Sequence, residues 1–507
     1  MAEASNDETR KAGRGLLWVT SGKIFFIVTA YTVALALPRV FGSEEVYGLF
    51  SVAFGAAAML NAVLISSTLQ TVSKLVSEDE AHAPQVLRKA LLLQLGIGAS
   101  LGVVLVGAAP WLAAHVFRSA AYTPLIRVAA AVVLAYALYS ALIGYLNGHQ
   151  RFARQAQLDM TFSVLRTIGL VGGAAVGIGA IGAMSGFSLA AVAILFVALA
   201  IVGVGRSGGE GVSWKRLVAF LAPIWLYQAA LQGILQIDLQ VLHYVASGVA
   251  ERSGVEDPGA VADGLSGIYR AAQTFAFVPY QLILSVTFVV FPFVSRATSL
   301  GDDEATRRYI SNALRFSLLV LLAVASPISG AAAGVIRIAY PQGYLVGAGA
   351  LEILVFGQVA FALFVIGATI VAGGGRPRIA ATVAVIGLVV VMVATWSLIT
   401  VFGVEGPSAL VATAIGTSIG TSTALLIIGV MVYRAFGTFV PPLSGVRALV
   451  AGAAGFGVAR VIPHESALSA LGALIGGFVA YGVVLVVTRE LGGTELGALR
   501  RVLRRGG

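Results

Sequence analysis

Seven charged side chains lie inside long apolar segments of this 507-residue chain: Lys23, Arg127, Arg166, Asp238, Arg270, Arg315 and Glu352. A charge in hydrocarbon is costly, so such residues are usually paired or functional. An Arg offers a planar fork to two phosphate oxygens, whereas a Lys offers a mobile point charge. A lone intramembrane Asp is a candidate site for a proton or another cation. The set therefore indicates either anion binding, cation coupling or structural ion pairs.

Uncharged polar residues form a second group in the same segments. Gln228, Gln232 and Gln236 recur every four residues, so they share one face of a helix. Asn61 and Gln70 make another apolar segment similarly polar. Amides are expensive toward lipid, so contact with a polar substrate and hydrogen bonding between helices are both open interpretations. The five His are isolated and Cys is absent, so no metal site, disulfide or thiol chemistry is expected.

The segments that hold these residues are long enough to cross a membrane. Apolar residues make up 58% of the chain and charged residues 11%, whereas soluble domains carry about 25% charged residues. A spanning helix needs about 20 mainly apolar residues. The sequence therefore predicts an all-α polytopic membrane protein with about 14 spans, at 16–38, 48–72, 89–110, 122–146, 158–181, 184–204, 217–244, 265–294, 309–331, 348–371, 379–402, 407–433, 446–462 and 466–488.

Basic residues between these spans alternate between two sides. Of those outside the spans, 23 fall on one side and 5 on the other, the minority being Arg39, Arg118, Arg252, Arg337 and Arg460. An excess of Lys and Arg marks the cytoplasmic side, so both termini are expected in the cytoplasm of a bacterial-type inner membrane. The bases are scattered singly, so they are expected to contact anionic lipid and no nucleic acid.

A repeat relates the two halves of the chain. Tyr47 and Lys74 are 27 positions apart across the second span, and Tyr269 and Arg296 have the same separation across the eighth. In both places a Ser precedes the base and an acidic cluster follows it. Six spans per repeat give two lobes of the same orientation, which is a common transporter plan. We predict a cytoplasmic N-terminus at 1–15, an N-lobe at 16–204, a C-lobe at 217–433, a helix pair at 446–488 and a basic cytoplasmic tail at 489–507.

Several segments resemble membrane proteins of polysaccharide biosynthesis. They cover both ends of the second helix, the loop after the fourth helix, the eighth helix and the tail. These segments read FGSEEVYG (41–48), VSKLVSE (72–78), LNGHQRF (146–152), VP (278–279), FPFVSR (291–296) and RELG (489–492). Together they resemble the multidrug/oligosaccharidyl-lipid/polysaccharide (MOP) superfamily. Within it, the chain is most similar to the polysaccharide and lipid-linked oligosaccharide flippases, which are related to the lipid II flippases.

The resemblance implies a defined architecture and a mode of transport. It implies a central V-shaped lumen between the lobes, lined chiefly by helices 1, 2, 7 and 8. It also implies that alternating access carries an undecaprenyl-diphosphate-linked sugar from the inner to the outer leaflet. In the lipid II flippases the last two of fourteen helices form a groove for the lipid tail, and the twelve-helix drug antiporters lack this pair. Fourteen helices therefore favour a lipid-linked substrate.

The strongest binding candidates are expected in that lumen. Lys23 is the first, with snorkelling to the cytoplasmic interface as its alternative. Arg270, beside Gln273, is the second, and its alternative is an ion pair with Asp238 that would also serve as an outer gate. Asp238 by itself is a candidate cation or proton site. The uncharged lumen candidates are Asn61, Gln70, Gln228, Gln232, Gln236 and Gln273.

The other intramembrane charges are weaker candidates. Arg166 and Arg315 lie on helices that are outer in the family plan, so snorkelling or pairing within the bundle is favoured for both. Arg127 and Glu352 lie near the outer surface, where placement at the membrane interface is expected.

The sequence thus predicts a transporter rather than an enzyme. The favoured substrate is an undecaprenyl-diphosphate-linked oligosaccharide of the polysaccharide or O-antigen type, and the alternatives are lipid II and, with cation coupling, drugs. A membrane glycosyltransferase or polymerase is less favoured, because its catalytic groups need sizeable external loops. The longest external loop is expected at about 245–264, where it is short and acidic.

No cofactor is expected, and the driving force is a proton gradient, a sodium gradient or the membrane potential. The expected partners are the lipid-linked sugar, membrane lipids and enzymes of polysaccharide biosynthesis, with a monomer as the functional form.

Overall fold

Helices make up all the regular structure in the described part of the chain. The structure, a computed structural model, describes residues 2–206, 212–283, 298, 302–402 and 407–491. Contacts divide the chain into unit 1, residues 1–267, and unit 2, residues 268–507. Every regular element within the described ranges is helical, so the predicted all-α class is confirmed.

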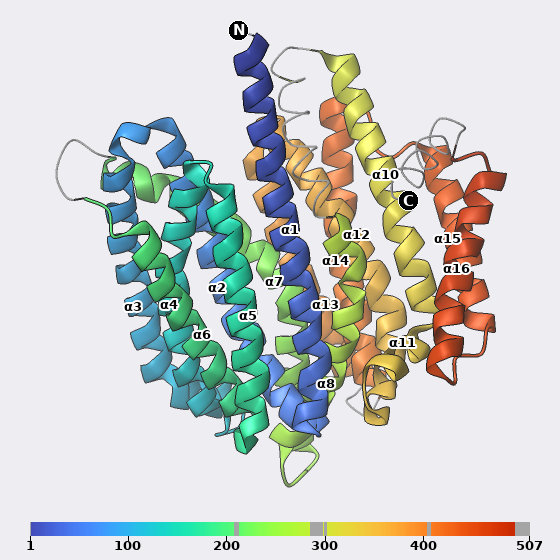
Figure 1. Ribbon diagram of the computed structural model, residues 1–507. Coiled ribbons are helices and arrows are strands. Elements are labelled where there is room, and N and C mark those ends of the chain that lie inside the picture. The colour runs from blue at the N-terminus through green and yellow to red at the C-terminus, as the bar shows by residue number, and fades with distance from the viewer. Residues whose placement is uncertain (1, 207–211, 284–297, 299–301, 403–406, 492–507) are drawn as a thin grey trace. The chain divides into compact units, whose positions relative to one another are not determined.

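Unit 1 is a bundle of long helices (Figure 1). Helix α2 packs against α4 and α7, α4 also packs against α3, and α5 packs against α1 and α6. Helix α8 begins in unit 1 and continues into unit 2. The elements are α1 (Ala2–Phe41), α2 (Glu44–Glu78), a 3₁₀ turn (Glu80–His82), α3 (Ala83–His115), α4 (Tyr122–Gly148), α5 (Phe152–Gly173), a π-helical turn (Ala174–Ile178), α6 (Gly179–Val202), α7 (Trp214–Arg252) and α8 (Pro258–Ala276).

Short polar connections set the ends of these helices. Gly42 adopts a φ of 67°, which ends α1 and is a conformation that glycine takes at little cost. The Ser43 hydroxyl then accepts a hydrogen bond from the Val46 N–H and caps α2. The Ser213 hydroxyl caps α7 in the same way, accepting from the Arg216 N–H. The sequence therefore encodes both the helix and its start at these positions.

Small residues let the helices of unit 1 approach closely. A Cβ atom added to Gly169 on α5 would lie 2.3 Å from the carbonyl oxygen of Gly186 on α6. One added to Gly173 would lie 2.2 Å from the carbonyl oxygen of Gly182. These distances leave no room for a side chain, so the two backbones are in direct contact. Such packing through small residues is typical of membrane helices.

Unit 2 follows the same packing rules. Helix α14 packs against α12 and α13, and α10 packs against both α15 and α16 (Figure 1). A Cβ on Gly330 of α10 would lie 2.4 Å from the carbonyl oxygen of Phe456 on α15, so these helices are also in backbone contact. The elements are α10 (Asp303–Gly330), α11 (Ala332–Ala339), a 3₁₀ turn (Gln342–Gly347), α12 (Ala348–Gly373), α13 (Pro377–Phe402), α14 (Pro407–Phe436), α15 (Pro442–Val461) and α16 (Ala467–Val487).

The membrane-spanning pattern agrees with the sequence prediction. Twelve segments of the described chain are long and apolar enough to cross a bilayer, and one of them, Phe152–Val202, contains both α5 and α6. Thirteen of the 14 predicted spans therefore have a counterpart. The remaining one, 265–294, begins on α8, which ends at Ala276, and continues over helical residues 278–283, while 284–294 lie outside the described residues. The same holds for residues 492–507 of the predicted tail.

Two predicted boundaries are wrong. The loop expected at 245–264 is only the five residues 253–257, because α7 continues to Arg252 and α8 begins at Pro258. Acidic residues suggested a loop there, but Asp263 is buried on α8. The turn between the fifth and sixth helices lies at 174–178 rather than near 182, because Gly177, at a φ of 85°, breaks the helix there.

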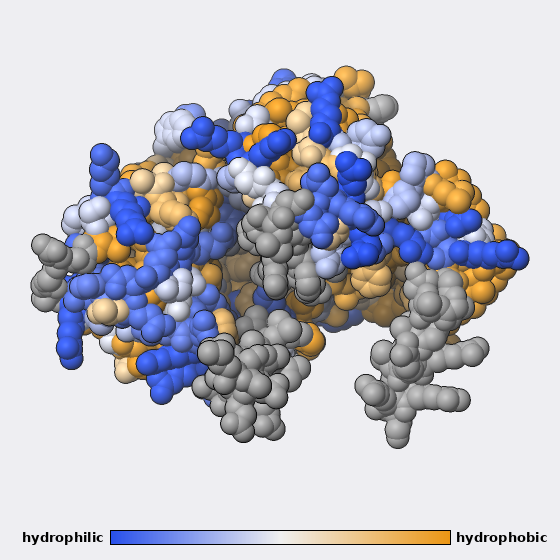
Figure 2. Space-filling model, turned by 90° about the horizontal axis from the view of Figure 1, so that it is seen from above, coloured by the Kyte–Doolittle hydropathy of each residue, from blue (hydrophilic) through white to orange (hydrophobic). Residues whose placement is uncertain are grey.

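Charged side chains gather at one end of unit 1. The loops that follow α2, α4 and α6 lie at this end, with Lys74, Arg88, Arg154, Arg206 and Lys215 on or beside them. We call it the basic end of unit 1. Figure 2 looks onto the face at which α1 begins and shows hydrophilic side chains spread across it. The division of the chain by contacts places α7 in unit 1, because α7 packs on α2, and the predicted lobe boundaries stay a prediction.

Candidate functional site

A polar face runs between α1 and α5 inside unit 1. Lys23 on α1 is exposed and lies within electrostatic range of Asp159 on α5. The Tyr139 hydroxyl of α4 donates a hydrogen bond of 3.2 Å to Asp159. One turn further along α1, Phe26 lies under the guanidinium of Arg166, whose Cζ is 4.2 Å from the ring centroid. We call Lys23, Asp159 and Arg166 the α1–α5 polar face.

Arg166 is the most unusual member of this face. Its side chain is buried within unit 1, with 8% of the residue exposed. Its Nε and Nη2 atoms have no hydrogen-bond partner among the described residues. Buried polar atoms without hydrogen-bond partners are rare in proteins, and they often mark a site that binds a ligand, ion or water. A guanidinium with free donors is suited to receive phosphate or carboxylate oxygens.

Asp159 was missed in the sequence because it lies at the edge of the predicted 158–181 span. Its separation of seven residues from Arg166 places both on one face of α5, about 10 Å apart along the helix. That spacing was available in the sequence and could have identified the carboxylate. The face therefore holds two cations and one anion, and it keeps an excess of positive charge.

The glutamine stripe of α7 packs partly against α2. A Cβ on Gly55 of α2 would lie 3.3 Å from Oε1 of Gln236 and 3.4 Å from Nε2 of Gln240. Gln240 also donates a hydrogen bond of 3.0 Å to the carbonyl oxygen of Val52. Gln240 continues the four-residue spacing and could have been found from it. Contacts with α2 therefore involve the end of the stripe at Gln236 and Gln240. Gln228 and Gln232 are half-buried and remain candidates for substrate contact.

The two polar candidates on α2 differ in their surroundings. Asn61 is buried, and neither atom of its amide has a hydrogen-bond partner among the described residues. Gln70, two and a half turns further along, is exposed. Thr68 between them accepts a hydrogen bond of 2.8 Å from Gln94 of α3. Asn61 and Gln70 remain predictions for substrate contact.

A buried cluster that the sequence did not reveal closes the opposite end of unit 1. His243 Nε2 lies 3.0 Å from Asp263 Oδ1, and the Tyr122 hydroxyl donates to the same oxygen. The three residues come from α7, α8 and α4, and Phe117 stacks on Tyr122 with ring centroids 4.5 Å apart. His243 looks isolated in the sequence, but the fold brings it next to Tyr122 and Asp263. The cluster fastens the start of α8 to two other helices.

Arg270 belongs to unit 2, where it has a neighbour on its own helix. Its Nη1 donates a hydrogen bond of 3.2 Å to Gln273 Oε1, and Gln273 is fully buried. Asp238, the predicted partner or cation site, is buried on α7 of unit 1. The ion pair between Asp238 and Arg270, and the gate that it would form, stay a prediction.

Arg315 is engaged in a structural network. Its Nε lies 2.6 Å from Oε1 of Glu490, and Arg447 Nη1 lies 3.1 Å from Oε2 of the same carboxylate. The Glu490 side chain is 1% exposed. Burial works to raise the pKa of Glu490, but hydrogen bonds from Ser444, Arg315 and Arg447 outweigh it and hold the pKa below its usual range. The sequence favours snorkelling or pairing within the bundle for Arg315, and the structure shows an ion pair with Glu490.

The remaining charges lie near the opposite end of the helices. Arg127 is exposed at the start of α4. Glu352 forms an ion pair with Arg460 of α15, and the nearby Arg337 donates to the carbonyl oxygen of His464. Within the described ranges no three His, Asp or Glu side chains are grouped as metal ligands would be.

Comparisons with known proteins agree with this architecture. The family of polysaccharide biosynthesis proteins matches residues 12–298, more than half of the chain. No curated protein matches the sequence. The fold is similar to the lipid II flippase MurJ in an inward closed conformation, with a TM-score of 0.75 and 15% identity over 94% of this chain and 99% of MurJ.

Two transporters share the fold over a smaller part of the chain. One is an inward-facing multidrug resistance MATE family transporter of the MOP superfamily, with a TM-score of 0.63 and 18% identity over 81% of this chain and 96% of that one. The other is a MOP superfamily transporter from Pyrococcus furiosus, with a TM-score of 0.57 and 18% identity over 84% and 96%. The matched sequence leads to one assignment: the chain belongs to the polysaccharide biosynthesis protein family, and it has the fold of the MurJ and MATE structures.

Proposed function

We propose that this protein is a flippase that moves an undecaprenyl-diphosphate-linked oligosaccharide from the inner to the outer leaflet by alternating access. The observation that carries the proposal is the α1–α5 polar face. It places a buried guanidinium with free donors, Arg166, and a second cation, Lys23, within segments that would span the membrane. Such donors would replace hydration that a diphosphate loses on leaving water.

The headgroup would meet the two cations in sequence. Lys23 lies nearer the basic end of unit 1, and Arg166 lies deeper along the same pair of helices. Asp159 lies within electrostatic range of Lys23 and accepts a hydrogen bond from the Tyr139 hydroxyl, so it would steady the ammonium before the headgroup arrives. Transfer of phosphate oxygens from a mobile Lys to a fixed Arg gives the headgroup a path away from the interface.

Lipid II is the second candidate substrate. It is favoured by the similarity to MurJ, which extends over nearly the full length of both chains, whereas the MATE transporter leaves about a fifth of this chain unmatched. Both candidate substrates carry a polyprenyl diphosphate, so the proposed roles of Lys23 and Arg166 hold for either. The sugar, which would contact residues such as Gln228 and Gln232, distinguishes them.

The proposal includes a setting in the cell. The basic end of unit 1 faces the cytoplasm of an inner membrane, and both termini lie there. The protein acts as a monomer without a cofactor, beside enzymes of polysaccharide biosynthesis, and a proton gradient, a sodium gradient or the membrane potential drives it. Asp238 and Arg270 serve as an outer gate or a cation site.

Replacing Arg166 by glutamine is expected to slow flipping about tenfold or more, since a hydrogen bond to a charged group contributes about 1.5–3 kcal/mol. Lys23→Ala and Arg270→Ala are also expected to slow it. The measurement is the initial rate at which a fluorescent undecaprenyl-diphosphate oligosaccharide reaches the outer leaflet of proteoliposomes. A parallel assay with lipid II tests the second candidate.

Arg154→Gln is the matched control, because Arg154 is an exposed Arg on the same helix. It should change the rate less than twofold while removing the same charge. Arg166→Lys restores the charge without the fork, so partial recovery is expected. Normal flipping by Lys23→Ala and Arg166→Gln together, at equal amounts of reconstituted protein, would refute the role of the polar face.

Reporter fusions test the proposed orientation. A reporter that is active only in the cytoplasm should be active when fused to either terminus and inactive when inserted between Ser253 and Asp257. The physical reason is the excess of basic residues on the side of the termini. Activity at one terminus alone would contradict an even number of crossings.

A further inference from the structure

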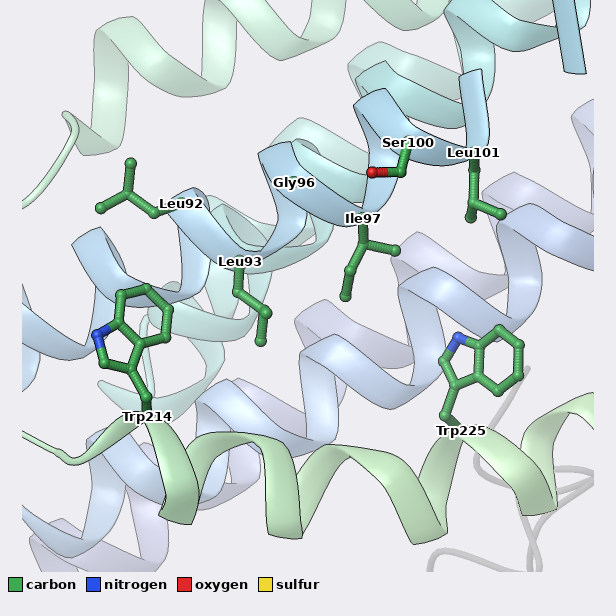
Figure 3. A pocket seen from close by; sticks show the side chains of 8 residues that line it. All are labelled: Leu92, Leu93, Gly96, Ile97, Ser100, Leu101, Trp214 and Trp225. Atoms are coloured by element: carbon green, nitrogen blue, oxygen red, sulfur yellow. The ribbon is translucent and has the colours of Figure 1, made fainter. Parts of the chain in front are cut away.

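An apolar groove opens on the side of unit 1 between α3 and the first three turns of α7. Its volume is about 540 Å³, which is within the range of small-molecule sites. Figure 3 shows Trp214 and Trp225 of α7 on one side and the side chains of α3 on the other. Ser100 is the one lining residue with a hydroxyl. The groove is lined by Leu92, Leu93, Gly96, Ile97, Ser100, Leu101, Trp214 and Trp225.

The groove exists because other contacts fix its two walls. On α3, Ile97 and Leu101 pack against a buried cluster of α2 and α4 that includes Leu64. On α7, Arg216 forms an ion pair of 2.9 Å with Glu78 of α2. Both walls are therefore anchored on α2. Between them, a Cβ added to Gly96 would meet no other atom within 4 Å among the described residues, so this glycine opens the middle of the groove.

The groove has the length and position of a lipid chain in one leaflet. Trp214 and Trp225 are eleven residues apart, or about 16 Å along α7, which is half of a hydrocarbon core about 30 Å thick. Both walls belong to segments that would span the membrane. Leu92, Trp214 and Trp225 are 50%, 46% and 37% exposed. The groove is therefore open to the surroundings of unit 1. The natural occupant at this depth is a hydrocarbon chain.

Basic residues lie at one end of the groove. Arg88 and Lys89 precede Leu92 and Leu93 by one helical turn, and Lys215 follows Trp214. The ammonium of Lys89 donates a hydrogen bond of 2.8 Å to the carbonyl oxygen of Val212, which ties the start of α7 to α3. At the same end, Glu78 of α2 is already bound to Arg216 and Lys74, and the adjacent Asp79 accepts a hydrogen bond from the His82 N–H. The charge at this end therefore complements an anionic headgroup.

We propose that this groove binds one anionic phospholipid of the leaflet at the basic end. One acyl chain lies between α3 and α7 and contacts Gly96 and Trp225. The phosphate lies at the level of Trp214, where Arg88 and Lys215 neutralise it, and an indole at this depth is typical of the membrane interface. The bound lipid fills the space between the two helices and supports the first turns of α7, independently of the substrate that the protein transports.

Native mass spectrometry of the full chain tests this site. The protein is reconstituted in vesicles of phosphatidylethanolamine with phosphatidylglycerol and then released into a mild detergent. The wild type is expected to retain one phosphatidylglycerol. Gly96→Leu should fill the groove and lower the retention of phosphatidylglycerol, which corresponds to a dissociation constant about tenfold higher. Gly107→Leu is the matched control, because Gly107 is an exposed glycine of α3 whose Cβ would also meet no described atom within 4 Å.

Two outcomes would overturn the site. One is equal retention of phosphatidylglycerol by Gly96→Leu and Gly107→Leu, and the other is equal retention of both phospholipids by the wild type. A second readout uses wild-type protein only, so it does not depend on the folding of a variant. Phosphatidylglycerol with a photoreactive group on its acyl chain should cross-link to peptides that contain Leu92–Leu101 or Trp225, and cross-links confined to other helices would also overturn the proposal.

Discussion

Glu490→Gln is expected to lower the free energy of unfolding of unit 2 by about 3 kcal/mol and to loosen α15 and α16 from α10. This is the lower end of the range for breaking a buried ion pair, because Arg315 and Arg447 keep 27% and 30% of their side chains exposed. Glutamine has the same shape as the native side chain but no charge, so both guanidinium groups lose their counter-ion. The measurement is the thermal unfolding midpoint of the purified protein in detergent, together with protease sensitivity of the segment between α15 and α16.

The control for this variant is Glu465→Gln, which removes an exposed carboxylate just before α16. It should leave the unfolding midpoint within about a degree, since exposed charges contribute little. A double-mutant cycle with Arg315→Gln should give a coupling energy, because both changes remove the same ion pair. Equal midpoints for Glu490→Gln and Glu465→Gln would contradict the structural role of this carboxylate.

The stabilising effect of Glu490 also depends on pH. Hydrogen bonds from Ser444 and the two arginines hold the pKa of Glu490 below its usual range in the folded protein, although burial opposes them. A carboxyl group whose folded pKa is depressed stabilises the fold fully above its unfolded pKa, about 4.3, and loses this effect as the pH falls through the folded value. The difference in stability between wild type and Glu490→Gln should therefore be constant from pH 8 to 5 and shrink below about pH 4.

The spans of this protein could be predicted from its sequence because hydropathy depends on composition over about 20 residues. The positions of α2, α4, α12 and α16 follow from apolar runs separated by short basic or polar connections. One boundary failed at a polar residue that has a tertiary partner, and another failed at Gly177, whose positive φ breaks the helix. Asp263 suggested a loop, but Tyr122 and His243 bind its carboxylate and let it be buried in a helix.

The candidate site also contains residues that a local sequence signal can identify and contacts that only the fold creates. Lys23 and Arg166 are predicted as candidates because a charge interrupts an apolar run, and this signal is local. The ion pair of Arg315 could not be predicted from a local signal, because its partner Glu490 is 175 residues away in the sequence. Gln240 lies between these cases, since its four-residue spacing is local and its contact with Val52 is not. Spacing therefore identifies a face of a helix, and only the fold shows what that face meets.

Gly267→Ala is expected to destabilise the start of α8, whereas Gly264→Ala, one turn earlier on the same helix, is not. A Cβ on Gly267 would lie 2.2 Å from the carbonyl oxygen of Glu44 and 2.9 Å from the amide nitrogen of Gly48. These are backbone atoms of α2 that cannot rotate away, so the helices must separate. Overpacking of this kind costs about 1–3 kcal/mol, and more where backbone must move. Gly48→Ala should act in the same direction, because its Cβ would overlap the carbonyl oxygen of Asp263.

Gly264 isolates the steric effect from the change in helix propensity. A Cβ there would meet no atom within 4 Å among the described residues, so Gly264→Ala should raise stability by up to about 0.5–1 kcal/mol through propensity alone. The two variants make the same chemical change three residues apart, and the unfolding midpoint should move in opposite directions. Separation of α2 from α8 would also pull Asp263 away from Tyr122 and His243, which leaves buried polar groups without partners and adds to the cost. If Gly267→Ala were as stable as Gly264→Ala, the backbone contact between α2 and α8 would not be what holds the start of α8 in unit 1.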